Sequence, residues 1–291
     1  MKLFYTPLQS VAANASYSPS AGKPAAFVEA ALGRFPGRVE VDRNFRGVSA
    51  KGLALAHHPD RVARVLALEE DNGFGNRLPE VAASLPWTTG SMWAAARHAA
   101  TAGGAACSPT SGFHHASYTS GGGFCTFNGL VVAAILLRAE GLARRVGIID
   151  FDAHWGNGTE DIIHRKGLGW IVNHSFGAFS GLIASPRAAE TWLAGLEEEL
   201  DQAAGNCDLL LYQAGADPHV DDPLGGYLTG DQLRRRDRAV FRWAAARGKP
   251  LAWNLAGGYQ IPLSKVLDLH LATVEECLDA FEGGDRSRPR D

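Results

Sequence analysis

The second half of the chain alternates short apolar runs with longer segments that carry helix boundary signals. The apolar runs are Val146–Asp152, Trp170–Asn173, Leu209–Gln213 and Leu251–Leu255. Between them lie segments that begin at Thr159, Ser185-Pro186 and Thr229, the last two ending at Gly205 and Gly248. Strands that alternate with helical crossovers predict a parallel sheet covered by helices. We therefore expect an α/β fold, a three-layer α/β/α arrangement around a mostly parallel central sheet.

The first half is less regular. A strand is predicted at Lys2–Thr6. Helices are predicted at Pro24–Leu32, Pro59–Leu68 and Thr89–Thr101, from about Gly129, and after Pro262. We interpret Asp71–Gly75 and Gly103–Gly123 as loops that line a site, because long loops in compact domains are usually functional.

Composition allows one large folded unit. The 291 residues are 46% hydrophobic and 20% charged, and we find no repeat or linker that would divide them. We expect a single domain over residues 1–283 and a disordered polar tail over residues 284–291. A net charge of −3 gives no reason to expect nucleic acid or an anionic membrane as a partner. The four cysteines form no CxxC pair, and no leader or membrane span is evident, so we expect a cytoplasmic protein. Oligomeric state is left open.

Unusual polar residues follow three of the predicted strands. They are Asp150, Asp152 and His154 after the first, Asp217 after the third, and Gly257, Gly258 and Tyr259 after the fourth. Ligands of open α/β sheets bind outside the carboxyl ends of the strands. We therefore expect these side chains to meet in one crevice.

Three of these residues form a candidate metal site. Asp152 and His154 are two apart on an extended chain and project to one side, and Asp217 would be the third ligand. This set leaves a coordination position open and suits Zn²⁺, although Fe²⁺ fits the same donors. The alternative is that Asp152 caps a helix and His154 is an ordinary loop histidine. The convergence with Asp217 favours the metal site.

A pair of histidines, His114 and His115, lies in a glycine-bounded loop. Two adjacent imidazoles can act as proton acceptor and electrostatic stabiliser, and each needs an orienting partner. Asp150 and Asn157 are the candidates for that role. A second pair, His57-His58, is interpreted as a loop and helix entry without chemistry.

Six strings of the chain together resemble the histone deacetylase and acetylpolyamine amidohydrolase family of the arginase/deacetylase fold, in its bacterial form. The strings are SGFHHAS at 111–117, GGGFCTFNG at 121–129, DFDAHWGNGTED at 150–161, QAGAD at 213–217, DDPLGG at 221–226 and AGGY at 256–259. Several motifs in order are far more specific than any one of them.

The resemblance implies a role for each matching residue. Asp152, His154 and Asp217 would bind the catalytic Zn²⁺, and His115 would be the general base for a zinc-bound water and later the acid. His114 paired with Asp150 would stabilise charge. Tyr259 would polarise the carbonyl. Asn157 stands where some members of the family have an aspartate.

The resemblance also implies a substrate channel and a second ion. Phe124 and Phe179 would form aromatic walls, with Gly123, Gly257 and Gly258 beside them. The segment around Phe179 is shorter than its usual counterpart. Backbone carbonyls around Asp150, Asp152 and His154 are similar to the family's monovalent-cation site, so K⁺ is expected.

The expected activity is metal-dependent hydrolysis of an N-acetyl group on an acetyl-lysine-like compound, an acetylpolyamine or another small acetylated amine. Two alternatives stand beside it. One is a catalytically idle homologue that binds acyl ligands, against which the complete residue set argues. The other is the ureohydrolase branch, which uses two metals and additional aspartates.

Overall fold

A seven-stranded sheet forms the centre of the computed structural model, which describes residues 1–12, 18–183 and 185–282. The strands are β1 (Lys2–Phe4), β2 (Glu40–Asp42), β3 (Ala105–Ser111), β4 (Val146–Asp150), β5 (Ile171–Ser175), β6 (Leu209–Gly215) and β7 (Leu251–Ala256). Their order is β2-β1-β3-β7-β6-β4-β5, and each pairing between them is parallel. The predicted α/β class with a parallel sheet is confirmed.

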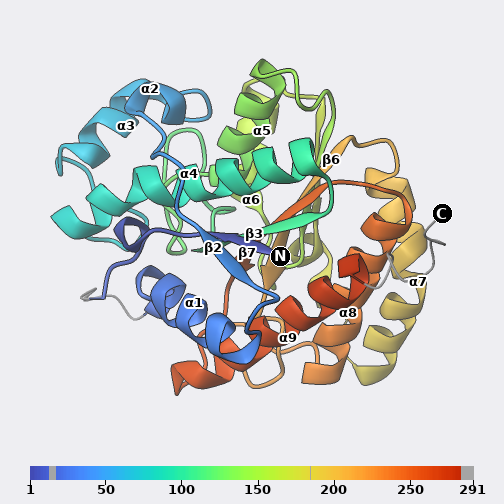
Figure 1. The fold of residues 1–291 in the computed structure, drawn as a ribbon. Coiled ribbons are helices and arrows are strands. Elements are labelled where there is room, and N and C mark those ends of the chain that lie inside the picture. The colour runs from blue at the N-terminus through green and yellow to red at the C-terminus, as the bar shows by residue number, and fades with distance from the viewer. Residues whose placement is uncertain (13–17, 184, 283–291) are drawn as a thin grey trace.

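Helices cover both faces of this sheet. They are α1 (Lys23–Arg34), α2 (Ala50–Leu53), α3 (Pro59–Leu66), α4 (Pro79–Ala102), α5 (Gly129–Ala139), α6 (Asn157–Arg165), α7 (Pro186–Ala204), α8 (Gly230–Ala246) and α9 (Leu263–Glu282). Figure 1 shows α4 and α5 on one side of the sheet and α1, α8 and α9 on the other. No helix in the described ranges has the length and apolar character needed to cross a membrane.

Each face of the sheet has its own hydrophobic core. Every residue of β4 and β6 is buried, as expected for central strands with helices on both sides. Successive side chains of β4 enter opposite cores: Ile148 packs with α4 and α5, whereas Ile149 packs with α1, α7, α8 and α9. The continuous apolar run of β4 thus reflects burial on two faces.

Capping residues form the helix starts that the boundary signals in the sequence predicted. The Ser185 hydroxyl accepts the N–H of Ala188 at the start of α7, where Pro186 occupies the first turn. At α8, Thr229 and Gln232 form a reciprocal capping box.

Three features of the first half differ from expectation. The predicted loop Gly103–Gly123 contains β3, an interior strand between β1 and β7. Its sequence AACSPTS is small and polar, and its register shifts between Ser108 and Ser111, around Pro109, so the usual strand pattern is absent. The short β2 was not predicted. Helix α4 begins at Pro79, ten residues before the predicted start at Thr89, and continues through Pro86, a residue that usually ends or kinks a helix. The predicted tail 284–291 lies outside the described residues.

Candidate metal centre and active site

The candidate site lies at the carboxyl ends of three neighbouring strands. Asp150 ends β4, and Asp152 and His154 follow it in the loop before α6. Asp217 comes two residues after β6, and Tyr259 three residues after β7. Because β7, β6 and β4 are adjacent in the sheet, segments far apart in sequence meet at one edge.

The three predicted ligands form a compact cluster. Ligand atoms of Asp152, His154 and Asp217 all lie within 4.8 Å of one another. Nδ1 of His154 is 3.0 Å from Oδ1 of Asp152 and 2.9 Å from Oδ2 of Asp217. Both carboxylates are buried, and Oδ1 of Asp217 has no hydrogen-bond partner within the described part of the chain. A buried carboxylate oxygen without a donor is costly, and a cation would remove that cost.

The electrostatics of the cluster also favour a bound cation. Burial and the neighbouring Asp152 carboxylate raise the pKa of Asp217. Hydrogen bonds to Asp152 and Asp217 raise the pKa of His154 to about 11. The cluster therefore concentrates negative charge that attracts a proton, and a divalent cation would displace that proton as it binds. This donor set fits a divalent metal ion.

The two histidines differ in their partners. Nδ1 of His114 lies 2.7 Å from Oδ2 of Asp150, in a fully buried contact. Nδ1 of His115 lies 2.7 Å from Oδ1 of Asn157. The ring centroids of His114 and His115 are 4.0 Å apart. The structure thus brings each histidine to the orienting residue that the sequence predicted for it.

These partners move the pKa values of the two rings in opposite directions. Burial opposes the charged form of His114, but the Asp150 and Asp152 charges outweigh it and raise the pKa of His114 to about 9. Burial and the adjacent His114 lower the pKa of His115, against the effect of the hydrogen bond that its Nδ1–H donates to Asn157. A charged imidazole thus stands beside a neutral one, an arrangement that separates stabiliser from base.

Asp150 is itself held by residues that the sequence reasoning did not single out. Its Oδ1 accepts from Nε2 of Gln213 at 3.1 Å, and its Oδ2 from the hydroxyl of Ser175 at 3.4 Å. Oε1 of Gln213 also accepts the N–H of Phe113, next to the histidine pair. A signal was available for Gln213, because it is a lone amide in an otherwise apolar central strand.

Tyr259 faces an aromatic wall. Its ring centroid is 5.5 Å from the ring centroid of Phe124. The ring of Phe124 in turn lies 5.9 Å from that of Phe74. Its backbone N–H donates to Oδ2 of Asp222 at 2.7 Å. Burial, followed by the Asp152 charge, raises the pKa of Tyr259, so its hydroxyl keeps its proton as a donor. Sequence reasoning placed Phe74 in a loop predicted to line a site and Asp222 in a family string, but it assigned neither a role.

Two of the predicted glycines make room for site residues. Gly123 has φ +53°, and a Cβ there would collide with the ring of His115. Gly257 has φ +48°, and a Cβ there would collide with the Asp217 carboxylate. Only glycine meets both conditions without strain. The neighbouring Gly258 also has a positive φ, and contact of these glycines with substrate stays a prediction.

Phe179 contacts a different set of aromatic residues from Phe124. Its ring centroid is 5.7 Å from that of His174 and 5.5 Å from that of Phe176. It is half-buried at a hollow formed with the start of α7. Its role as the second channel wall stays a prediction.

Lys23, in α1, is a further residue that the sequence reasoning did not consider. It is completely buried, and its ammonium group donates to the carbonyl of Gly257, two residues before Tyr259. Burial lowers the pKa of Lys23 to about 8, against the attraction of Asp217 and Asp152. A lysine at a helix start carries no sequence signal of such burial.

His57 and His58 have structural contacts. Nδ1 of His58 accepts the N–H of Asp60 at the start of α3, which agrees with a helix entry. His57 is buried between the Ser117 carbonyl and the Asn128 N–H, each 2.8 Å from a ring nitrogen. Burial lowers the pKa of His57 to about 3.

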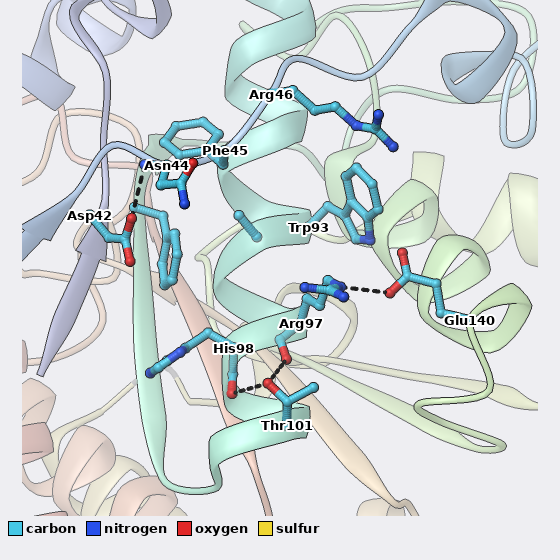
Figure 2. Close-up of a pocket in the computed structure, with 11 residues that line it drawn as sticks. Asp42, Asn44, Phe45, Arg46, Trp93, Arg97, His98, Thr101 and Glu140 are labelled. Carbon is cyan, nitrogen blue, oxygen red and sulfur yellow. Dashed lines mark hydrogen bonds and ion pairs between the residues drawn. The ribbon is translucent and has the colours of Figure 1, made fainter.

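A cavity of about 590 Å³ lies elsewhere, between α4 and the segment after β2 (Figure 2). Two of its arginines have partners within the cavity: Arg97 donates to Glu140 at 3.1 Å, and the Arg46 guanidinium lies 5.7 Å from the centre of the Trp93 ring. None of the residues of the candidate site lines it. Convergent titratable groups favour the metal cluster as the active site.

Comparison with known proteins agrees with this fold. The family model of the histone deacetylase domain matches residues 30–175. Acetylpolyamine amidohydrolase 1 of Pseudomonas aeruginosa is 28% identical, over 65% of this chain and 58% of its own length. Histone deacetylase 2 of Arabidopsis thaliana is 31% identical, over 54% of this chain and 44% of its own length. The crystal structure of the HDA15 HD domain superposes with a TM-score of 0.75 at 20% identity, covering 97% of this chain and 88% of that one.

The chain therefore belongs to the histone deacetylase family. The alignments span less than two thirds of the length of these curated relatives. The relatives that carry a descriptive name are deacetylases or acetylpolyamine amidohydrolases.

Proposed function

We propose that this protein hydrolyses an N-acetyl amide of a small linear amine or an acetyl-lysine-like compound. The observation that carries the proposal is the geometry of the two histidines, His114 at 2.7 Å from Asp150 and His115 at 2.7 Å from Asn157, beside three residues that fit one divalent ion. The different partners also move the pKa values of the two rings in opposite directions. An idle acyl-binding protein has no need for two histidines whose charge states are held apart.

Asp152, His154 and Asp217 would hold Zn²⁺, or Fe²⁺ in its place. When bound, the ion acidifies water and polarises the acyl oxygen. The neutral His115 accepts a proton from the attacking water, while Asn157 fixes its other ring nitrogen. The same ring then delivers this proton to the leaving amine.

Two other groups stabilise the charge that develops on the acyl oxygen. Tyr259 holds its phenolic proton and donates a hydrogen bond to this oxygen, and its ring is placed by Phe124 and by the backbone bond to Asp222. The imidazolium of His114, fixed by Asp150, adds a positive charge within the site.

The substrate class follows from the names of the relatives. The relatives' names refer to histones and acetylpolyamines, and both substrates present an acetyl group on a primary amine at the end of a linear chain. Phe124, Phe179 and the three glycines at 123, 257 and 258 would line the path of that chain. K⁺ would bind the backbone around Asp150, and a cytoplasmic location completes the proposal.

Hydrolysis of a fluorogenic acetyl-lysine amide and of N-acetylputrescine tests this function. Chelation should abolish turnover, and added Zn²⁺ or Fe²⁺ should restore it. His115→Ala should nearly abolish turnover with metal still bound, whereas the control His164→Ala, an exposed histidine of α6, should have no effect. Turnover that survives His115→Ala would contradict the proposed base.

A further inference from the structure

A buried arginine of α8 contacts both segments that carry the candidate metal ligands. Arg236 is 1% exposed. Its Nη1 donates to the carbonyl of Phe151 at 2.9 Å and to the carbonyl of Gly215 at 2.8 Å. Phe151 immediately precedes Asp152, and Gly215 stands two residues before Asp217.

This contact lies beyond the point where β4 and β6 pair with each other, although Gly215 still pairs with Ala256 of β7. The registered pairing of β4 with β6 ends at Asp150 and Gln213, and the bond from Phe151 N–H to the Gln213 carbonyl is the last backbone–backbone bond between them. Further on, the N–H of Ala153 donates to Oδ2 of Asp217 at 3.2 Å. Buried carbonyls beyond that point need a donor. A single guanidinium nitrogen supplies it to both, and a bond from a charged donor is stronger than one between neutral groups.

The guanidinium is itself held in one orientation. Nε and Nη2 of Arg236 contact Oδ1 of Asp237 at 2.8 and 2.7 Å. Asp237 also accepts the hydroxyl of Tyr212, from β6, and the hydroxyl of Thr273, from α9. The arginine is thereby fixed against β6 and α9.

We propose that Arg236 is a positioning residue that sets the separation of Asp152 and Asp217 and so tunes the affinity and geometry of the metal site. The inference rests on the proposed function, since it takes these two carboxylates as metal ligands. Stability alone is a weak account of Arg236, because burying an ion pair usually costs about as much as the attraction returns. Residues behind metal ligands commonly change metal affinity by about 10 to 100-fold.

The test compares two variants of Arg236 with a matched control. Arg236→Met removes the charge and the donors, and Arg236→Lys keeps one charged nitrogen, so it preserves the fold even where the Met variant does not. Arg238→Met is the control: Arg238 lies two residues on in α8, its side chain is partly exposed, and it pairs with Glu276 of α9 and not with a carbonyl of β4 or β6. Thermal unfolding reports the stability of each variant.

Zn²⁺ affinity is measured by competition with a chromophoric chelator, and site geometry by the visible absorption of the Co²⁺-loaded protein at saturation. We expect the Zn²⁺ dissociation constant to rise about tenfold or more in the Arg236 variants and to stay within about twofold in Arg238→Met. The Co²⁺ spectrum should change only in the Arg236 variants, which a purely stabilising role would not produce.

Equal affinity and an unchanged spectrum in the folded Arg236 variants would overturn this inference and leave the proposed function standing. Failure of the wild-type chain to bind Zn²⁺ or Co²⁺ would instead overturn the proposed function. The two failures are therefore distinguishable.

Discussion

Replacement of Asn157 by aspartate changes one atom type beside the proposed base. Oδ1 of Asn157 lies 2.7 Å from Nδ1 of His115, so Asn157→Asp puts a carboxylate oxygen in contact with the ring. A neutral amide orients the imidazole but does not stabilise its protonated form, whereas a carboxylate does both.

The expected change in the pKa of His115 depends on how exposed the two side chains are. Opposite charges about 4 Å apart interact by about 4 kcal/mol at the effective dielectric constant of a protein surface. Asn157 is solvent-exposed and His115 is half-buried, so solvent screening reduces this figure. We expect the pKa of His115 to rise by about one unit, which is about 1.4 kcal/mol.

The sign of the effect on rate is fixed by the proposed role. His115 must be neutral to accept a proton, so a higher pKa moves the acidic limb of the kcat/KM profile to higher pH. Below that limb, Asn157→Asp should be about tenfold slower than the wild type, and the two should converge at alkaline pH. The control Asn206→Asp adds the same charge before the amino end of β6 and should leave the profile unchanged.

The assay is kcat/KM over a pH series, on protein shown to bind metal at wild-type stoichiometry. The limb can report an apparent value for coupled groups, so only its displacement is interpreted. An acidic limb that does not move in Asn157→Asp would refute the pairing of Asn157 with a catalytic His115.

Three other residues give independent tests. Tyr259→Phe should lower kcat by about 10²-fold with metal content unchanged, because it removes one oxyanion donor, and near-normal turnover would reduce Tyr259 to packing. Lys23→Met should lower kcat, because it removes the hydrogen bond to the Gly257 carbonyl, two residues before Tyr259. In a double-mutant cycle it should add little to the effect of Tyr259→Phe, and fully additive effects would contradict the idea that Lys23 acts through Tyr259. His57 is neutral in the fold because burial lowers its pKa to about 3, so the unfolded chain binds the extra proton between about pH 6.5 and 3, and stability falls as pH falls through that window. His57→Asn should flatten this slope in urea unfolding of the metal-free protein, and an unchanged slope would contradict it.

The sequence predicted the half of the fold whose elements obey simple periodicities. Three of the four apolar runs of the second half became β4, β6 and β7, every residue of which is buried, and the fourth became the partly buried edge strand β5. The strand β3 escaped prediction because Ala105–Ser111 contains small polar residues and Pro109, and its place is secured by its neighbours β1 and β7. Strand order depends on contacts far apart in sequence, which periodicity does not record.

The candidate site shows the same division. Asp152, His154, Asp217 and Tyr259 were predicted because they follow predicted strand ends, and the family resemblance supplied the individual roles of His115 and Tyr259. Lys23 and Arg236 were missed because their importance arises from burial against backbone carbonyls of distant segments. A charged residue in a helix is ordinarily expected to face solvent, and nothing local marks these two as exceptions.

Divalent metal content per chain, measured by mass spectrometry after dialysis, tests the central claim most directly. The wild-type protein and the control Asp221→Ala, an exposed carboxylate of the following loop, should each carry one ion. Asp152→Ala and Asp217→Ala should each lose it while circular dichroism shows a folded chain. Retention of the ion at wild-type occupancy in both variants would contradict the assignment of Asp152, His154 and Asp217 as the metal site.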